Sequence, residues 1–260
     1  MRLLLEGGCF LAGLLAGSLL EVVIERVPTK QSLARPWFAC SQCSSELVPI
    51  VRVLPVVWWI ASRGRCKSCG ERFSVRRLGV EVTTGTLFSL SAIRFGADLV
   101  LLAYCIFAGL LVVATVVDAR MRIVPVRFVY PALVATLVVF PLAAVFDHSS
   151  SSLVHAAIGG ASAFGFFFLV HFIYPDGLGF GDVRLAFLIG VYLGWLGEAY
   201  VFVGLALSFV FAAVAGLWLV IFRGQGRKSS VPLVPFLAAG SLITVFWGAP
   251  ITRFWLGIHG

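Results

Sequence analysis

Long runs of apolar residues, bounded by charged and turn-forming residues, divide the chain. An α-helix needs roughly 20 residues to cross about 30 Å of hydrocarbon. Six runs reach about that length, at residues 3–24, 99–117, 128–146, 153–174, 199–222 and 233–252. Two shorter runs, 78–93 and 183–197, carry Glu81 and Arg184 near their starts. The pattern predicts an all-α polytopic membrane protein with about eight transmembrane helices.

Composition supports the same class. Hydrophobic residues make up 60% of the chain and charged residues 12%, and the mean hydropathy is +1.02. A soluble globular protein is usually about a quarter charged. The composition therefore excludes an ordinary soluble globular protein.

The distribution of basic residues predicts the orientation. Cytoplasmic segments of membrane proteins are enriched in Lys and Arg. With the amino terminus outside, 17 of the 20 Lys and Arg residues fall on the inner side of the membrane. Anionic lipid headgroups attract such segments, so the net charge of +8 suits a membrane surface. We see no nucleic-acid-binding module and expect membrane lipids, not nucleic acid, as partners.

Three segments follow from this topology. Residues 1–24 are expected to form the first transmembrane helix, 25–77 a polar cytoplasmic loop, and 78–260 a helical membrane domain. The loop is the only part outside the helices that is large enough for a soluble subdomain.

The loop contains two CxxC motifs separated by 22 residues. Their cysteines are Cys40, Cys43, Cys66 and Cys69. Four thiolates in this spacing suit a tetrahedral zinc ion, and a site with four sulfur ligands is structural because no position stays open for water. The alternatives are two disulfides or four free thiols, but the reducing cytoplasm disfavours disulfides. We predict a structural zinc site.

Two aspartates stand out among only five in the chain. Asp118 directly follows the apolar run 99–117, and Asp182 follows a glycine-rich turn after another apolar run. An ionisable residue at such a place is costly unless it is solvated or paired, and it usually marks a functional site. The predicted topology puts both residues on the inner side. Two close carboxyl groups share a proton, so one activates water while the other donates to a carbonyl oxygen. The pair predicts peptide hydrolysis without a metal.

The residues beside Asp182 favour this interpretation. Gly179 and Gly181 allow a close approach of a substrate backbone, and Arg184 is placed to stabilise a negative charge or to contact a lipid phosphate. The alternative is a flexible loop in which Asp182 only caps a helix. The four histidines show no spacing typical of a metal site.

Several segments carry a recognisable pattern, and along the chain they are residues 17–28, the two CxxC motifs, residues 64–66, residues 80–85, Asp118, residues 177–185 and residues 231–240. Their types and order resemble those of the type 4 prepilin leader peptidases, which are membrane aspartyl proteases of the Gly-x-Gly-Asp kind. Together the segments extend over nearly the whole chain.

The resemblance implies a function. Members of this family cut a short basic leader from type 4 prepilin or pseudopilin precursors at the cytoplasmic face of the bacterial inner membrane. Many then methylate the new amino terminus with S-adenosylmethionine. By this resemblance Asp118 and Asp182 are the catalytic pair. Two alternatives stay open: a transporter or assembly factor whose aspartates bind an ion, and a homologue that only binds pilins.

Overall fold

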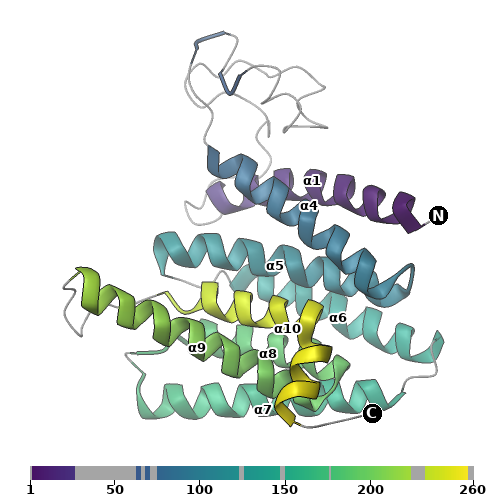
Figure 1. Ribbon diagram of the computed structural model, residues 1–260, viewed down its shortest axis with the longest axis vertical. Coiled ribbons are helices and arrows are strands. Elements are labelled where there is room, and N and C mark those ends of the chain that lie inside the picture. Colours follow the sequence, from purple (N-terminus) through teal and green to yellow (C-terminus); the bar gives the residue numbers. More distant parts are fainter. Residues whose placement is uncertain are drawn as a thin grey trace. The chain divides into compact units, whose positions relative to one another are not determined.

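The computed structural model describes residues 2–26, 63–65, 68–70, 75–122, 126–146, 150–175, 177–223 and 232–256. This part of the chain forms eight α-helices (Figure 1), so the predicted all-α class is confirmed. Each predicted apolar run coincides with one of them, to within one residue where the run extends past the helix. The helices are α1 (Arg2–Arg26), α4 (Val75–Phe95), α5 (Leu99–Met121), α6 (Val126–Phe146), α7 (Ser150–Ile173), α8 (Phe180–Leu196), α9 (Glu198–Arg223) and α10 (Val234–Leu256).

Six of these eight helices are long and apolar enough to cross a membrane: α1, α5, α6, α7, α9 and α10. The other two are the ones predicted from the shorter runs. Helix α4 carries several charged residues, and α8 has 17 residues, which span about 25 Å at 1.5 Å per residue. The chain has the helices of a polytopic membrane protein, and crossing by α4 and α8 stays a prediction.

The first of two compact units comprises Met1–Ala97, in which α1 packs along α4. Glycines bring the two backbones together: a Cβ atom on Gly13 would lie 2.7 Å from the Cα of Gly85, and one on Gly17 would lie 2.7 Å from the Cα of Glu81. Gly13 and Gly17 are four residues apart on one face of α1. This small-xxx-small spacing is the usual way in which membrane helices approach closely.

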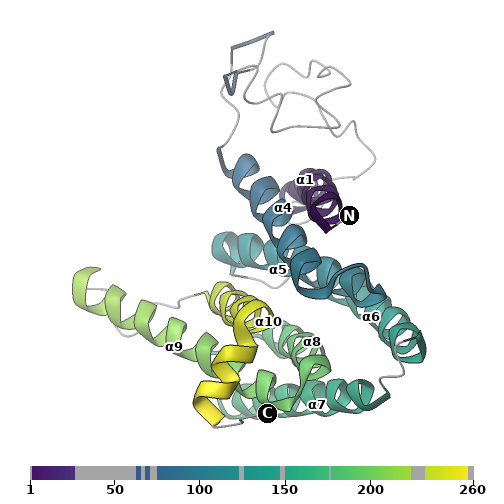
Figure 2. The ribbon, with the colours of Figure 1, turned by 45° about the vertical axis from the view of Figure 1, so that its right-hand side comes forward.

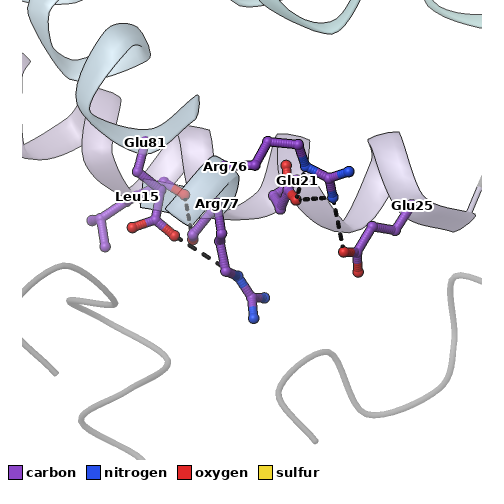
Figure 3. Close-up of polar contacts among 7 residues, drawn as sticks. Leu15, Glu21, Glu25, Arg76, Arg77 and Glu81 are labelled. Atoms are coloured by element: carbon purple, nitrogen blue, oxygen red, sulfur yellow. Dashed lines mark hydrogen bonds and ion pairs between the residues drawn. The ribbon is translucent and has the colours of Figure 1, made fainter. Parts of the chain in front are cut away.

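Ion pairs join the end of α1 to the start of α4 (Figure 3). Arg76 donates to Oε1 of Glu21 through Nε, at 3.1 Å, and to Oε1 of Glu25 through Nη2, at 3.0 Å. Arg77 Nε lies 4.0 Å from Oε1 of Glu81. Glu21 and Glu81 are each only 1% exposed, so these arginines supply the positive charges that buried carboxylates need.

The second unit comprises Asp98–Gly260 and contains α5 to α10, which pack side by side as a bundle (Figures 1 and 2). Helices α5 and α8 lie in its interior, since most of their residues are buried. Few residues of helix α9 are buried, as expected of a lipid-facing helix. The two interior helices are those that carry Asp118 and Asp182.

Helices α7 and α8 approach each other on glycines. A Cβ atom on Gly190 would lie 2.3 Å from the carbonyl oxygen of Gly159, and one on Gly194 would lie 2.4 Å from that of His155. Gly190 and Gly194 repeat the small-xxx-small spacing of α1. Because no larger side chain fits there, α7 fixes the position of α8.

Tyr192 links α8 to α5 and α6. The hydroxyl of Tyr104 donates to the carbonyl oxygen of Tyr192 at 2.7 Å, and the hydroxyl of Tyr192 shares a 2.7 Å hydrogen bond with that of Thr136. The ring of Phe107 stacks on Tyr192 with centroids 4.2 Å apart. These contacts set the longitudinal position of α8 against α5.

Most of the predicted loop 25–77 lies outside the described residues. Cys40, Cys43 and Cys66 fall there, while Cys69 is described and exposed. The zinc site and the division into 1–24, 25–77 and 78–260 therefore stay predictions.

Candidate active site

Asp118 lies in the last turn of α5 and is 5% exposed. The helix ends at Met121 because Arg122 adopts a left-handed conformation, with φ of 54°, and its N–H bonds to the carbonyl oxygen of Asp118 at 2.8 Å. This is a common way for a helix to end. The termination holds Asp118 at the end of a buried helix.

Asp182 lies in the first turn of α8. The chain enters this helix through Gly179, whose carbonyl oxygen accepts a hydrogen bond of 3.0 Å from the N–H of Asp182. A carboxylate in the first turn is favoured by the helix dipole. Asp182 is half-buried. Because α8 follows α7 along the chain after a short connection, the first turn of α8 lies near the carboxyl end of α7.

A third helix contacts the site. The backbone N–H of Val234, the first residue of α10, donates a 3.1 Å hydrogen bond to Oδ2 of Asp118. Free N–H groups at a helix start attract anions. Helix α10 therefore stabilises the negative charge of Asp118.

The two carboxyl groups are close enough to interact electrostatically. Asp182 lies outside the six candidate membrane spans. Burial raises its pKa, and the negative charge of Asp118 raises it further, to about 6, against a backbone hydrogen bond at Gly179 that lowers it. One proton on two interacting carboxyl groups is the protonation state of an aspartic protease pair. An ionised Asp118 with a protonated Asp182 has the base and the acid that peptide hydrolysis requires.

Gly179, in the turn before α8, packs closely against the carboxyl group of Asp182. A Cβ atom on Gly179 would lie 3.3 Å from Oδ2 of Asp182, so this position has little room for a side chain. Gly181 lies beside Asp182 in the first turn of α8. The roles predicted for these glycines as a supporting loop stay predictions.

Arg184 lies on another face of α8. Residues two apart on a helix point roughly 200° apart, so Arg184 is directed away from the side on which Asp182 lies. Its guanidinium carbon lies 4.7 Å from the ring centroid of Phe180 and 5.7 Å from that of Tyr130. The structure thus places Arg184 against aromatic rings rather than beside the carboxyl pair.

The sequence did not predict the contribution of Val234, although residues 231–240 were noted among the family motifs. Such a contact leaves no local signal, because it comes from a backbone N–H, which every residue except proline has. Within the described residues, no group of three or more His, Cys, Asp or Glu side chains could hold a metal ion. Three of the four cysteines of the predicted zinc site lie outside that part.

Two family models match the chain. Residues 11–95 match the bacterial peptidase A24 N-terminal domain, and residues 105–221 match the type IV leader peptidase family. The second match includes both Asp118 and Asp182. No solved structure matches the chain.

Several relatives carry the name prepilin leader peptidase/N-methyltransferase. The Bacillus subtilis (strain 168) protein is 30% identical, over 95% of this chain and 96% of its own length. The Pseudomonas putida protein is 29% identical, over 92% of this chain and 89% of its own. The Myxococcus xanthus protein is 32% identical, over 83% of this chain and 63% of its own. With its aspartate pair inside the matched region, this chain belongs to the type IV leader peptidase family.

Proposed function

We propose that this chain is a membrane aspartic endopeptidase that removes the leader from type 4 prepilin-like precursors. The observation that carries the proposal is the electrostatic coupling of Asp118 and Asp182, which are on different helices of one bundle. Family membership and the names of the relatives support the substrate class.

The arrangement supplies the groups that the reaction needs. Asp118, ionised and hydrogen-bonded to Val234, takes a proton from the attacking water, and protonated Asp182 donates its proton to the oxygen of the scissile carbonyl. As the tetrahedral species collapses and its C–N bond breaks, Asp118 gives the proton it took from water to the leaving amine, and Asp182 takes back a proton from a hydroxyl of the tetrahedral species. Both carboxyl groups lie at one end of the bundle, so a precursor held by its own apolar helix would present its cleavage site at a membrane surface.

We place the active site at the cytoplasmic face of the bacterial inner membrane. Three basic residues lie where α5 ends and α6 begins, Arg120, Arg122 and Arg127, and the cytoplasmic ends and connections of membrane helices are enriched in such residues. Asp118 lies at this end of α5. A basic leader would then be removed before the precursor's helix leaves the membrane.

Co-expression with a type 4 pilin precursor tests the proposal. Leader removal is followed by gel shift and mass spectrometry for the wild type, Asp118→Asn, Asp182→Asn and the matched control Asp98→Asn. Asp98 is the residue before α5, and its side chain makes no capping hydrogen bond, so its substitution makes the same chemical change away from the site. Cleavage by the wild type and Asp98→Asn alone supports the proposal. Cleavage by either of the other two variants refutes the assignment of the catalytic pair, and no cleavage by a well-expressed wild type favours an ion-binding or assembly role.

We also propose that the chain methylates the new amino terminus, with S-adenosylmethionine as co-substrate. The support is the second half of the relatives' name, and no described residue is assigned to this co-substrate. The mass of the cleaved product tests it: an increase by one methylene group is expected, and an unmodified amino terminus refutes methylation while leaving the peptidase proposal intact.

The four cysteines are proposed to bind one structural zinc ion. Two CxxC motifs supply the four thiolates that such a site uses. Metal analysis of the purified chain is expected to find one zinc per chain, and Cys69→Ser should release it. A wild type without bound zinc overturns this proposal.

A further inference from the structure

A crevice of about 270 Å³ opens on the second unit between α6, α7 and α8. Its lining is almost wholly apolar, and Arg184 is the only charged residue among the lining residues, which are Val129, Tyr130, Leu133, Phe164, Arg184, Phe187 and Leu188. The face of α8 that carries Arg184 lines the crevice, whereas Asp182, in the first turn of the same helix, lies on another face. The crevice is therefore distinct from the carboxyl pair.

The surface around the crevice is apolar and exposed. Tyr130, Val134 and Leu137 on α6 are each at least half exposed. Their spacing of four and three residues puts them on one face of the helix. In a membrane protein a continuous exposed apolar face contacts lipid chains, so the crevice opens toward the bilayer rather than toward water.

Arg184 has its positive charge available. No described carboxylate forms an ion pair with it, and its guanidinium lies over the rings of Phe180 and Tyr130. A guanidinium can pack over aromatic rings and also bind a phosphate through its planar set of N–H groups, so the two contacts are compatible. Arginine and tyrosine near helix ends typically lie at the level of lipid headgroups. The positive charge of Arg184 and its expected position at the level of the headgroups both suit an anionic lipid headgroup.

The volume of the crevice limits which kind of molecule can bind in it. A helix with its side chains is about 10–12 Å across, too wide for a cavity of about 270 Å³, whereas a single acyl chain is narrow enough. We propose that the crevice binds one anionic phospholipid, with an acyl chain along Leu133 and Leu188 and the phosphate on Arg184. The lipid would contact the first turns of α8.

Photolabelling of the full-length protein in nanodiscs tests this site. Two probes carry the same diazirine-bearing acyl chain, one on phosphatidylglycerol and one on phosphatidylcholine, and labelled peptides are identified by mass spectrometry. Variants are Arg184→Gln, which removes the charge, Leu133→Trp, which fills the crevice, and the control Arg94→Gln. Arg94 also lies over an aromatic ring, 5.8 Å from the centroid of Phe95, but it is in the first unit and does not line the crevice.

The phosphatidylglycerol probe is expected to label α6 and α8 peptides that line the crevice. Arg184→Gln should reduce that labelling roughly fivefold, the usual contribution of one basic residue near anionic lipid. Leu133→Trp should abolish it, and Arg94→Gln should leave it unchanged. Equal labelling by both probes, or equal effects of Arg184→Gln and Arg94→Gln, overturns the proposal. Loss of labelling on adding a prepilin precursor would assign the crevice to the substrate's helix and overturn it as well.

Discussion

The N–H of Val234 hydrogen-bonds to Oδ2 of Asp118 at 3.1 Å, although the two residues are 116 positions apart. The bond joins the start of α10 to the end of α5. The N–H donor favours an ionised Asp118, whereas burial and the negative charge of Asp118 raise the pKa of Asp182 to about 6, against the backbone hydrogen bond at Gly179 that lowers it. We therefore expect Asp118 to act as the base and Asp182 as the acid.

Val234→Pro tests the contribution of this hydrogen bond. Proline has no N–H but is well tolerated at the first position of a helix. A hydrogen bond to a charged group contributes about 1.5–3 kcal/mol, so we expect kcat/KM for precursor cleavage to fall by roughly tenfold or more. The control is Val234→Ala, which retains the N–H and loses only the buried side chain. Equal activity of the two variants would show that the hydrogen bond plays no part in catalysis.

The pH dependence of cleavage follows from the pKa of Asp182. Its pKa is raised to about 6, so the group is protonated below about pH 6 and becomes ionised above it. If protonated Asp182 is the acid, kcat/KM should fall as the pH rises through about 6. Asp98→Asn should show the same profile as the wild type. The measurement is kcat/KM of the purified enzyme in nanodiscs from pH 5 to 8, and a rate that rises across this range would contradict the assignment of Asp182 as the acid.

Gly179→Ala should disturb the reacting carboxyl group without unfolding the chain. The new methyl group would lie 3.3 Å from Oδ2 of Asp182, so the carboxyl group must shift by a few tenths of an ångström. Misplacement of catalytic groups by about 1 Å can cost 10²-fold in rate, and we expect a roughly tenfold loss of cleavage.

The matched control for this substitution is Gly165→Ala in α7, where a Cβ atom meets nothing within 4 Å. Expression level and thermal unfolding of both variants should equal those of the wild type. Full activity of Gly179→Ala would mean that the carboxyl group tolerates the displacement, and that close packing at Gly179 is not needed.

Hydrophobic pattern alone predicted most of the fold. Each apolar run became a helix because a membrane span must satisfy its backbone hydrogen bonds internally. Charge distribution predicted that Asp118 and Asp182 lie on the same side of the membrane, and the structure brings them into one bundle. The Tyr104–Tyr192 contact and the hydrogen bond from Val234 could not be predicted, since each depends on how distant helices pack.

The packing roles of individual glycines could not be predicted from the sequence either. The sequence marks Gly190 as an ordinary small residue within an apolar run, while the structure shows that α7 and α8 meet there backbone to backbone. Only the packing distinguishes it from Gly216 on α9, where a Cβ atom would meet nothing within 4 Å. Substitution of the two glycines should therefore have opposite outcomes.

Gly190→Ala should destabilise the protein strongly. The added Cβ atom would lie 2.3 Å from the carbonyl oxygen of Gly159. This oxygen belongs to the backbone, so it cannot move aside as the end of a flexible side chain can. Such overpacking typically costs about 1–3 kcal/mol, and the separation of α7 and α8 would also displace Asp182 from Asp118. Gly216→Ala should be neutral or slightly stabilising, because alanine has the higher helix propensity. Thermal unfolding in detergent, measured with cleavage activity, compares the two variants; equal midpoints for both would show that the α7–α8 contact tolerates a methyl group.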